Sequence, residues 1–192
     1  MSDAEVKDTL HEYLVTARSA VVWKLDGLSE YDVRRPVTPT GTNLLGLVKH
    51  LTMVEACYFG RAFDRPFPEP LRWWDEDAEV DADLWAREDE TRAEIVSRYR
   101  RACEHSDDTI RELALGATGL VPWWSRPGVT LHQMLVHVLS ETSRHAGHAD
   151  IVREQLDGAA GSTPTAPQLG DRDAADWERH RARIEAAART FA

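Results

Sequence analysis

The chain of 192 residues has few cysteines and no long apolar run. These two features argue against a secreted disulfide-rich protein and against a membrane-spanning one. Its two cysteines, Cys57 and Cys103, have neither CxxC spacing nor the density of a secreted disulfide framework. No apolar stretch approaches the ~20 residues that span a bilayer. The N-terminus also has no basic segment followed by a hydrophobic core, as a signal peptide would. We therefore expect a cytoplasmic protein that does not contact a membrane.

Basic residues are in the minority, which argues against a nucleic-acid partner. The chain has 23 Lys and Arg against 33 Asp and Glu, for a net charge of −10. Binding to phosphates needs a concentrated basic patch, and the sequence has none. Segments with the two-residue period of a β-strand are also missing, as are internal repeats. The length fits one domain with a substantial core. These features predict a single all-α domain.

Apolar residues recur at helical spacing in four long segments. The segments are residues 2–28, about 40–63, about 84–106 and 130–158. The last has the clearest ends: Thr130 and Gln133 form a potential capping box, and Gly158 follows the last periodic residue. We predict one long helix for each segment.

Two irregular connections, residues 64–83 and 114–129, each carry a tryptophan pair. Loops of this length inside a compact domain are uncommon and often serve as lids or site walls. Trp73 and Trp74 in the first loop either seal one end of the core or line a pocket. Together with the second pair, Trp123–Trp124, they suggest an aromatic rim at one end of the bundle.

The C-terminal part is expected to be an addition to this bundle. Residues 159–170 are rich in Gly, Ala, Ser, Thr and Pro, which is typical of an exposed linker. A final helix should follow, with Trp177 and Ile184 available to dock it. The predicted architecture is thus an up-down four-helix bundle over residues 1–158. A linker and an additional C-terminal helix, residues 159–192, are expected to pack on the same domain.

A polar ladder lies within the apolar stripe of the fourth helix. Glu141, His145 and His148 are three and four residues apart, so they share one helix face and can converge on one point. A carboxylate and an imidazole one turn apart suit a metal ion in a helical bundle. The same residues are also compatible with a solvated polar edge that contains one hydrogen-bonded core histidine. The pattern on this helix leaves both interpretations open.

His50 is the residue on another helix that could complete such a site. It lies beside the inward stripe of the second helix. A lone histidine there is more often a core or edge residue than a ligand. Gly46, one turn earlier, is expected to let another helix or a bound group approach closely.

The sequence resembles the DinB-like metalloprotein superfamily, and within it an actinobacterial subgroup of unknown function. The matching stretches are VWKLDGL at residues 22–28, LLGLVKHL at 44–51 and the segment 141–158. With the spacing between them, the resemblance covers about residues 9–158.

This resemblance implies a metal site with three ligands, His50, Glu141 and His145. Many members have His in place of Glu141. The related N-terminal domain of mycothiol-dependent maleylpyruvate isomerase looks like a member with His, Glu and His as ligands, so Glu141 has a precedent in the superfamily. The metal expected first is Zn²⁺, with Ni²⁺, Mn²⁺ or Fe²⁺ as alternatives. His148 stands where other members often carry Gln and is expected to move protons at the pocket edge. Asp150 is a candidate acceptor for an imidazole N–H.

The resemblance also implies an activity, that of a metal-dependent enzyme. We expect an S-transferase or isomerase that uses mycothiol, or a related small thiol, on a small electrophile. Arg144 or Arg153 would hold an anionic group of the thiol or substrate. An apolar wall would be formed by Trp73, Trp74, Trp123 and Trp124.

Three other interpretations stay open. The first is a stress-linked protein that binds a metal or small ligand without turnover. The second is a metal-dependent hydrolase with His148 as its base. The third is purely structural, with Glu141 hydrogen-bonded to His145 inside the bundle. A homodimer through helix faces is compatible with all of these patterns.

Overall fold

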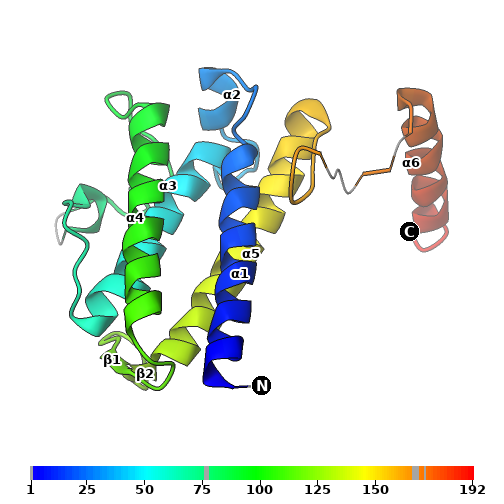
Figure 1. The fold of residues 1–192 in the computed structure, drawn as a ribbon. Helices are drawn as coiled ribbons and strands as arrows, with labels where there is room; N and C mark the ends of the chain where they lie inside the picture. Colours follow the sequence, from blue (N-terminus) through cyan, green and yellow to red (C-terminus); the bar gives the residue numbers. More distant parts are fainter. Residues whose placement is uncertain (1, 76–77, 166–168, 171) are drawn as a thin grey trace.

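A computed structural model describes residues 2–75, 78–165, 169–170 and 172–192. Four long helices form a bundle (Figure 1), which confirms the predicted all-α architecture; they are α1 (Asp3–Trp23), α3 (Leu44–Glu55), α4 (Arg92–Glu112) and α5 (Leu131–Asp157). In the part of the chain that is described, no helix has the length and apolar character needed to cross a membrane.

Short elements connect these helices. They are the helix α2 (Glu30–Arg34), the π-helical turn η1 (Ala56–Gly60), the 3-10 turns η2 (Arg61–Phe63) and η3 (Arg72–Trp74), and the strands β1 (Thr118–Leu120) and β2 (Gly128–Thr130). The two strands form a small antiparallel hairpin inside the connection that was predicted to be irregular.

Side-chain caps set where the helices begin. The Asn43 side chain accepts a hydrogen bond from Gly46 N, so α3 starts at Leu44. Thr91 and Glu94 form a capping box, so α4 starts at Arg92 and not near residue 84 as predicted. At the start of α5, Thr130 accepts from Gln133 N, which is one half of the capping box that the sequence suggested.

The bundle helices run in the order up, down, down, up (Figure 1). Lys7 near the start of α1 donates to the carbonyls of Arg111 and Leu113 at the end of α4, so α1 and α4 are antiparallel. Gly119 in β1, after α4, lies against Ala62 in η2, after α3. Helices α3 and α4 therefore end at the same end of the bundle and run parallel. Residues 64–91 must return along the bundle to connect them.

A buried ion pair lies among α1, α3 and α4. Arg18 donates to both carboxylate oxygens of Glu55, each at 2.7 Å, and to Asp107 at 2.6 Å. Burial disfavours the Arg18 guanidinium, but the Glu55 charge and its hydrogen bonds outweigh this and raise the Arg18 pKa above its usual value. The apolar core surrounds this pair, with Leu14, Leu51 and Tyr99 among its fully buried side chains.

A second set of buried charges ties the end of α5 to α1. The Lys24 ammonium is fully buried and contacts Asp150 at 2.8 Å and the carbonyl of Gly161 at 2.5 Å. Arg153 donates to the carbonyls of Lys24 and Asp26 and pairs with Asp157. These contacts fix the segment after α5 against the bundle.

Residues 82–85 pack directly on the first turn of α3. A Cβ atom added to Gly46 would lie 1.8 Å from the carbonyl oxygen of Leu84. Asn43 Nδ2 donates to that same oxygen at 3.1 Å. Gly46 therefore permits a close approach, but the approaching group is the backbone of the long connection and not the helix or bound group expected from the sequence.

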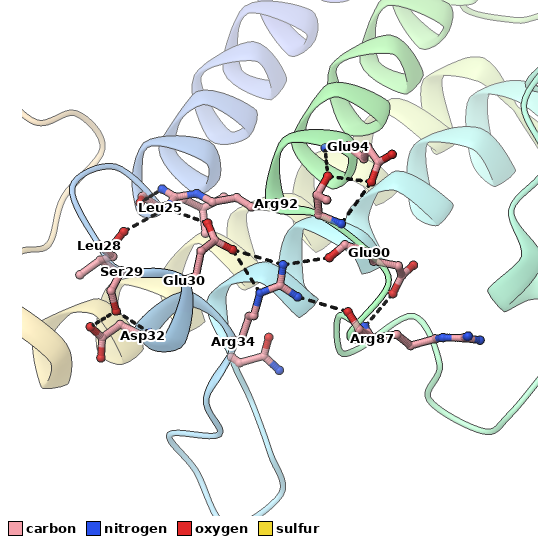
Figure 2. A network of polar contacts seen from close by, with 12 residues as sticks. Leu25, Leu28, Ser29, Glu30, Asp32, Arg34, Arg87, Glu90, Arg92 and Glu94 are labelled. Atoms are coloured by element: carbon pink, nitrogen blue, oxygen red, sulfur yellow. Dashed lines mark hydrogen bonds and ion pairs between the residues drawn. The ribbon is translucent and has the colours of Figure 1, made fainter.

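A polar network holds the end of that connection (Figure 2). Arg34 in α2 donates to the carbonyls of Arg87 and Glu90, and Arg92 donates to those of Leu25 and Leu28. The start of α4 is thus attached to both α2 and the turn that follows α1. The connection is thus fixed directly after residues 82–85.

The helix α6 (Ala174–Arg189) has no buried residue and lies apart from the bundle (Figure 1). Ile184 in this helix is 58% exposed. Docking of this helix on the bundle, and its membership of the same domain, stay predictions.

Gly46→Ala should destabilise the protein, because the new methyl group meets backbone that cannot move without breaking the contacts of residues 82–85. We expect a loss of about 1–3 kcal/mol in the free energy of unfolding, measured by urea denaturation. Gly147→Ala is the matched control, since a Cβ there meets nothing within 4 Å on an α-helix. The control should be neutral or slightly stabilising. Equal effects of the two changes would contradict the close approach.

Arg18→Met should destabilise the protein strongly, because it leaves the fully buried Glu55 carboxylate without its cation. Removal of one partner of a buried pair lowers the unfolding free energy by about 3–5 kcal/mol. Arg189→Met removes an exposed pair with Glu185 and should change little. A similar midpoint of thermal unfolding for both variants would argue against a structural role for the buried pair.

Candidate functional site

The bundle brings His50 on α3 beside the polar ladder of α5. The ring centroids of His50 and His145 lie 4.9 Å apart, with the rings tilted by 66°. The two side chains are 19% and 14% exposed, so solvent reaches them only in part. The structure thus brings together the two histidines that the sequence analysis placed on different helices.

The ladder residues approach one another along α5. The distance from His145 Nε2 to Glu141 Oε2 is 3.6 Å, and that from His145 Nδ1 to His148 Nδ1 is 3.4 Å. Burial, followed by the nearby His50 and His148 rings, lowers the pKa of His145 to about 4. His145 is therefore neutral at neutral pH and keeps a lone pair for a proton or a metal ion.

Asp83 from the long connection is the acceptor for His50. The His50 Nδ1 atom lies 2.6 Å from Asp83 Oδ2. Burial alone would raise the pKa of the Asp83 carboxyl, but the hydrogen bond and charge of His50 lower it below its usual value. Asp150, the expected acceptor, instead accepts from Gly161 N and pairs with Lys24, so that expectation is wrong.

His137 extends the ladder by one further turn before Glu141, and the sequence analysis missed it. Its ring packs edge-on against Tyr58 and Trp124, with centroids at 4.5 and 4.9 Å. Burial lowers the pKa of His137, although the nearby Glu141 opposes this. The four-residue step from Glu141 was the available signal. Tyr58 belongs to the π-helical turn η1, and such turns are frequent at functional sites.

The tryptophans of the first loop have different surroundings. Trp74 lies against Trp123 with ring centroids 6.5 Å apart, and Trp123 in turn lies near Tyr58. Trp73 contacts two cations, Lys49 and Arg98, whose charged groups lie 4.8 and 5.2 Å from its ring, while Trp74 also faces one cation, the Arg61 guanidinium, at 5.2 Å. Only Trp74 therefore joins the aromatic cluster next to His137.

The two arginines predicted to bind an anionic group differ in their availability. Arg144 is exposed next to His145, and its charge contributes to the lowered pKa of that ring. Arg153 is 7% exposed, and its guanidinium is engaged by two backbone carbonyls and by Asp157. Binding of a ligand by Arg153 stays a prediction and requires these contacts to break.

The chemistry of the His50, Glu141 and His145 set fits a divalent metal, since it offers two imidazoles and one carboxylate. Neutral His145 is the form that coordinates metal, and Asp83 on His50 is the usual outer partner of a metal-ligating histidine. Within the described ranges, however, no group of three or more His, Cys, Asp or Glu side chains is arranged to hold a metal ion. The residue types therefore fit, while their side chains do not complete the site.

Comparison with known proteins identifies a family. The family model for mycothiol S-transferase matches residues 9–158, which include most of α1, the other three bundle helices and both long connections. Among curated proteins, none matches the sequence. Because the match covers most of the chain, the protein belongs to the mycothiol S-transferase family, a DinB-like family.

Proposed function

We propose that the protein transfers mycothiol to a small electrophile. In this reaction the thiol sulfur forms a bond to an electrophilic carbon, the leaving group departs with its electron pair, and the thiol proton passes to a base. The observation that carries the proposal is the half-buried group of His50, Glu141 and His145 between α3 and α5, within the residues that match the family.

We further propose that His50, Glu141 and His145 hold a divalent metal, with Zn²⁺ expected first. When bound, the metal would supply a positive charge that lowers the pKa of a nearby thiol. The support is the chemistry of the donor set, and the side chains must move to bring all three donors onto one ion.

Asp83 is proposed to hold His50 in one tautomer. A proton on Nδ1 donates to the Asp83 carboxylate across 2.6 Å and leaves the lone pair of Nε2 free. The same hydrogen bond fixes the orientation of the ring.

His148 is proposed to carry the thiol proton to solvent. It is exposed, while the neighbouring His145 is mostly buried, so the pair connects the interior of the site to water. Trp74, together with Tyr58 and Trp123, would form the apolar wall for the electrophile, and Arg144 would contact an anionic group on either reactant.

Thiol transfer is tested by incubating the purified full chain with mycothiol and monobromobimane, and following the fluorescent thioether. His50→Ala and His145→Ala should each lower the rate by roughly a hundredfold or more, since each removes a group of the reacting centre. His132→Ala, at the exposed start of α5, is the control and should keep full activity. Metal content is measured on the same samples.

Three results would go against the proposal. Equal rates in all three variants would exclude the histidine group from the reaction. Hydrolysis of an ester without any thiol would favour a metal-dependent hydrolase. Binding of metal and mycothiol with no consumption of any electrophile would favour a protein without turnover.

Asp83→Asn should weaken metal binding, because the neutral amide accepts a weaker hydrogen bond from His50 Nδ1 than the charged carboxylate does and orients the ring less firmly. Loss of such a partner lowers metal affinity by about 10–100-fold, measured by competition with a chelating dye. Glu88→Gln is the control, as an exposed carboxylate in the same connection. An unchanged affinity in Asp83→Asn would show that Asp83 does not support the metal.

A further inference from the structure

A cavity of about 620 Å³ lies between the long connection, α3 and α4, with Ala82 and Trp85 in its lining. None of the proposed metal ligands lines it, and neither does the aromatic cluster around Trp74. Its size is that of a typical small-molecule pocket. The indoles of Trp73 and Trp85 contribute its aromatic walls.

Fixed charges form one part of the lining. Lys49 is only 1% exposed, and its ammonium donates to Glu90 at 2.7 Å and to the Trp85 carbonyl at 3.0 Å. Arg98 pairs with Glu69 and contacts the Trp73 ring. These groups are positioned by the fold before any ligand binds.

Three further charged side chains form a second part of the cavity lining. Arg72, Asp75 and Glu79 line the cavity, and in the described part of the chain their side chains form no hydrogen bond or ion pair. Both signs of charge are thus available, which disfavours a polyanion or a polycation as the ligand. Carboxylates that accept, a guanidinium that donates and two indole faces together suit an uncharged ring with several hydroxyl groups.

The cavity and the histidine group have a common wall. Lys49 and His50 are consecutive in α3, and they bind Trp85 and Asp83 of the same short segment. A ligand in the cavity therefore lies against the backbone segment that holds His50.

We propose that this cavity binds the polyhydroxylated part of the thiol substrate. The inference rests on the proposed function, because mycothiol carries its cysteinyl thiol on a glucosaminyl-inositol unit. The cavity would select this thiol over simple thiols by contacts made far from the sulfur. Glu79 is a specificity residue in this arrangement and takes no part in the transfer step.

The kinetic test compares mycothiol with N-acetylcysteine, which has no sugar. In Glu79→Gln we expect the KM for mycothiol to rise roughly five- to tenfold, since a hydrogen bond to a charged group is lost. The kcat and the rate with N-acetylcysteine should not change. Glu88→Gln, with the same charge change outside the cavity, should leave both thiols unaffected. An unchanged preference for mycothiol in Glu79→Gln and in Trp73→Leu would overturn the inference.

A binding test separates this inference from the proposed function. N-acetylglucosaminyl-inositol, which lacks the cysteinyl group and keeps the uncharged amide, is added to the full chain, and its contacts are followed by saturation-transfer difference NMR. Binding that weakens in Trp73→Leu and Glu79→Gln, but not in Glu88→Gln, supports the cavity even if no thiol transfer is found. Absence of binding overturns the inference even if transfer is found.

Discussion

The contact between the Leu84 carbonyl and Gly46 is the constraint on which the site depends. Residues 82–85 pack closely on the first turn of α3, because glycine at position 46 has no side chain that would clash with them. Asp83 and Trp85 then lie on either side of this contact and bind His50 and Lys49. One close approach of backbone to helix therefore positions a proposed ligand and a wall of the cavity together.

The helix order explains why this connection exists. Because α3 and α4 run parallel, the chain must return along the bundle between them, and a helix of the length of α4 spans about 30 Å. The return path is fixed by Asn43, Gly46 and the Arg34 network, so it is a structured wall. Buried ion pairs such as Arg18–Glu55 hold the helices to which it attaches.

The apolar periodicity of the sequence was sufficient to predict the bundle helices, but it could not predict the path of the long connection. Apolar spacing and caps predicted four long helices, with α5 nearly to the residue. The start of α4 was placed eight residues early, because the apolar Leu84 and Trp85 continue a helical pattern while the Thr91 cap determines the real start. The partnership of His50 with Asp83 depends on a tertiary contact, and no local pattern in the sequence encodes it. His137 did have a local signal, its four-residue step from Glu141.

Trp73 and Trp74 are consecutive in the long connection but differ in their surroundings. Adjacent in the chain, the two indoles have different partners: the Lys49 and Arg98 cations of α3 and α4 for Trp73, and Trp123 together with the Arg61 guanidinium for Trp74. His50, Glu141 and His145 are in neither set of contacts. Residues 82–85 connect His50, through Asp83, to the cavity that Trp73 and Trp85 line. If the proposed transfer takes place at the histidine group, changes in the loop would alter which thiol or electrophile binds, while the helices would keep the reacting centre unchanged.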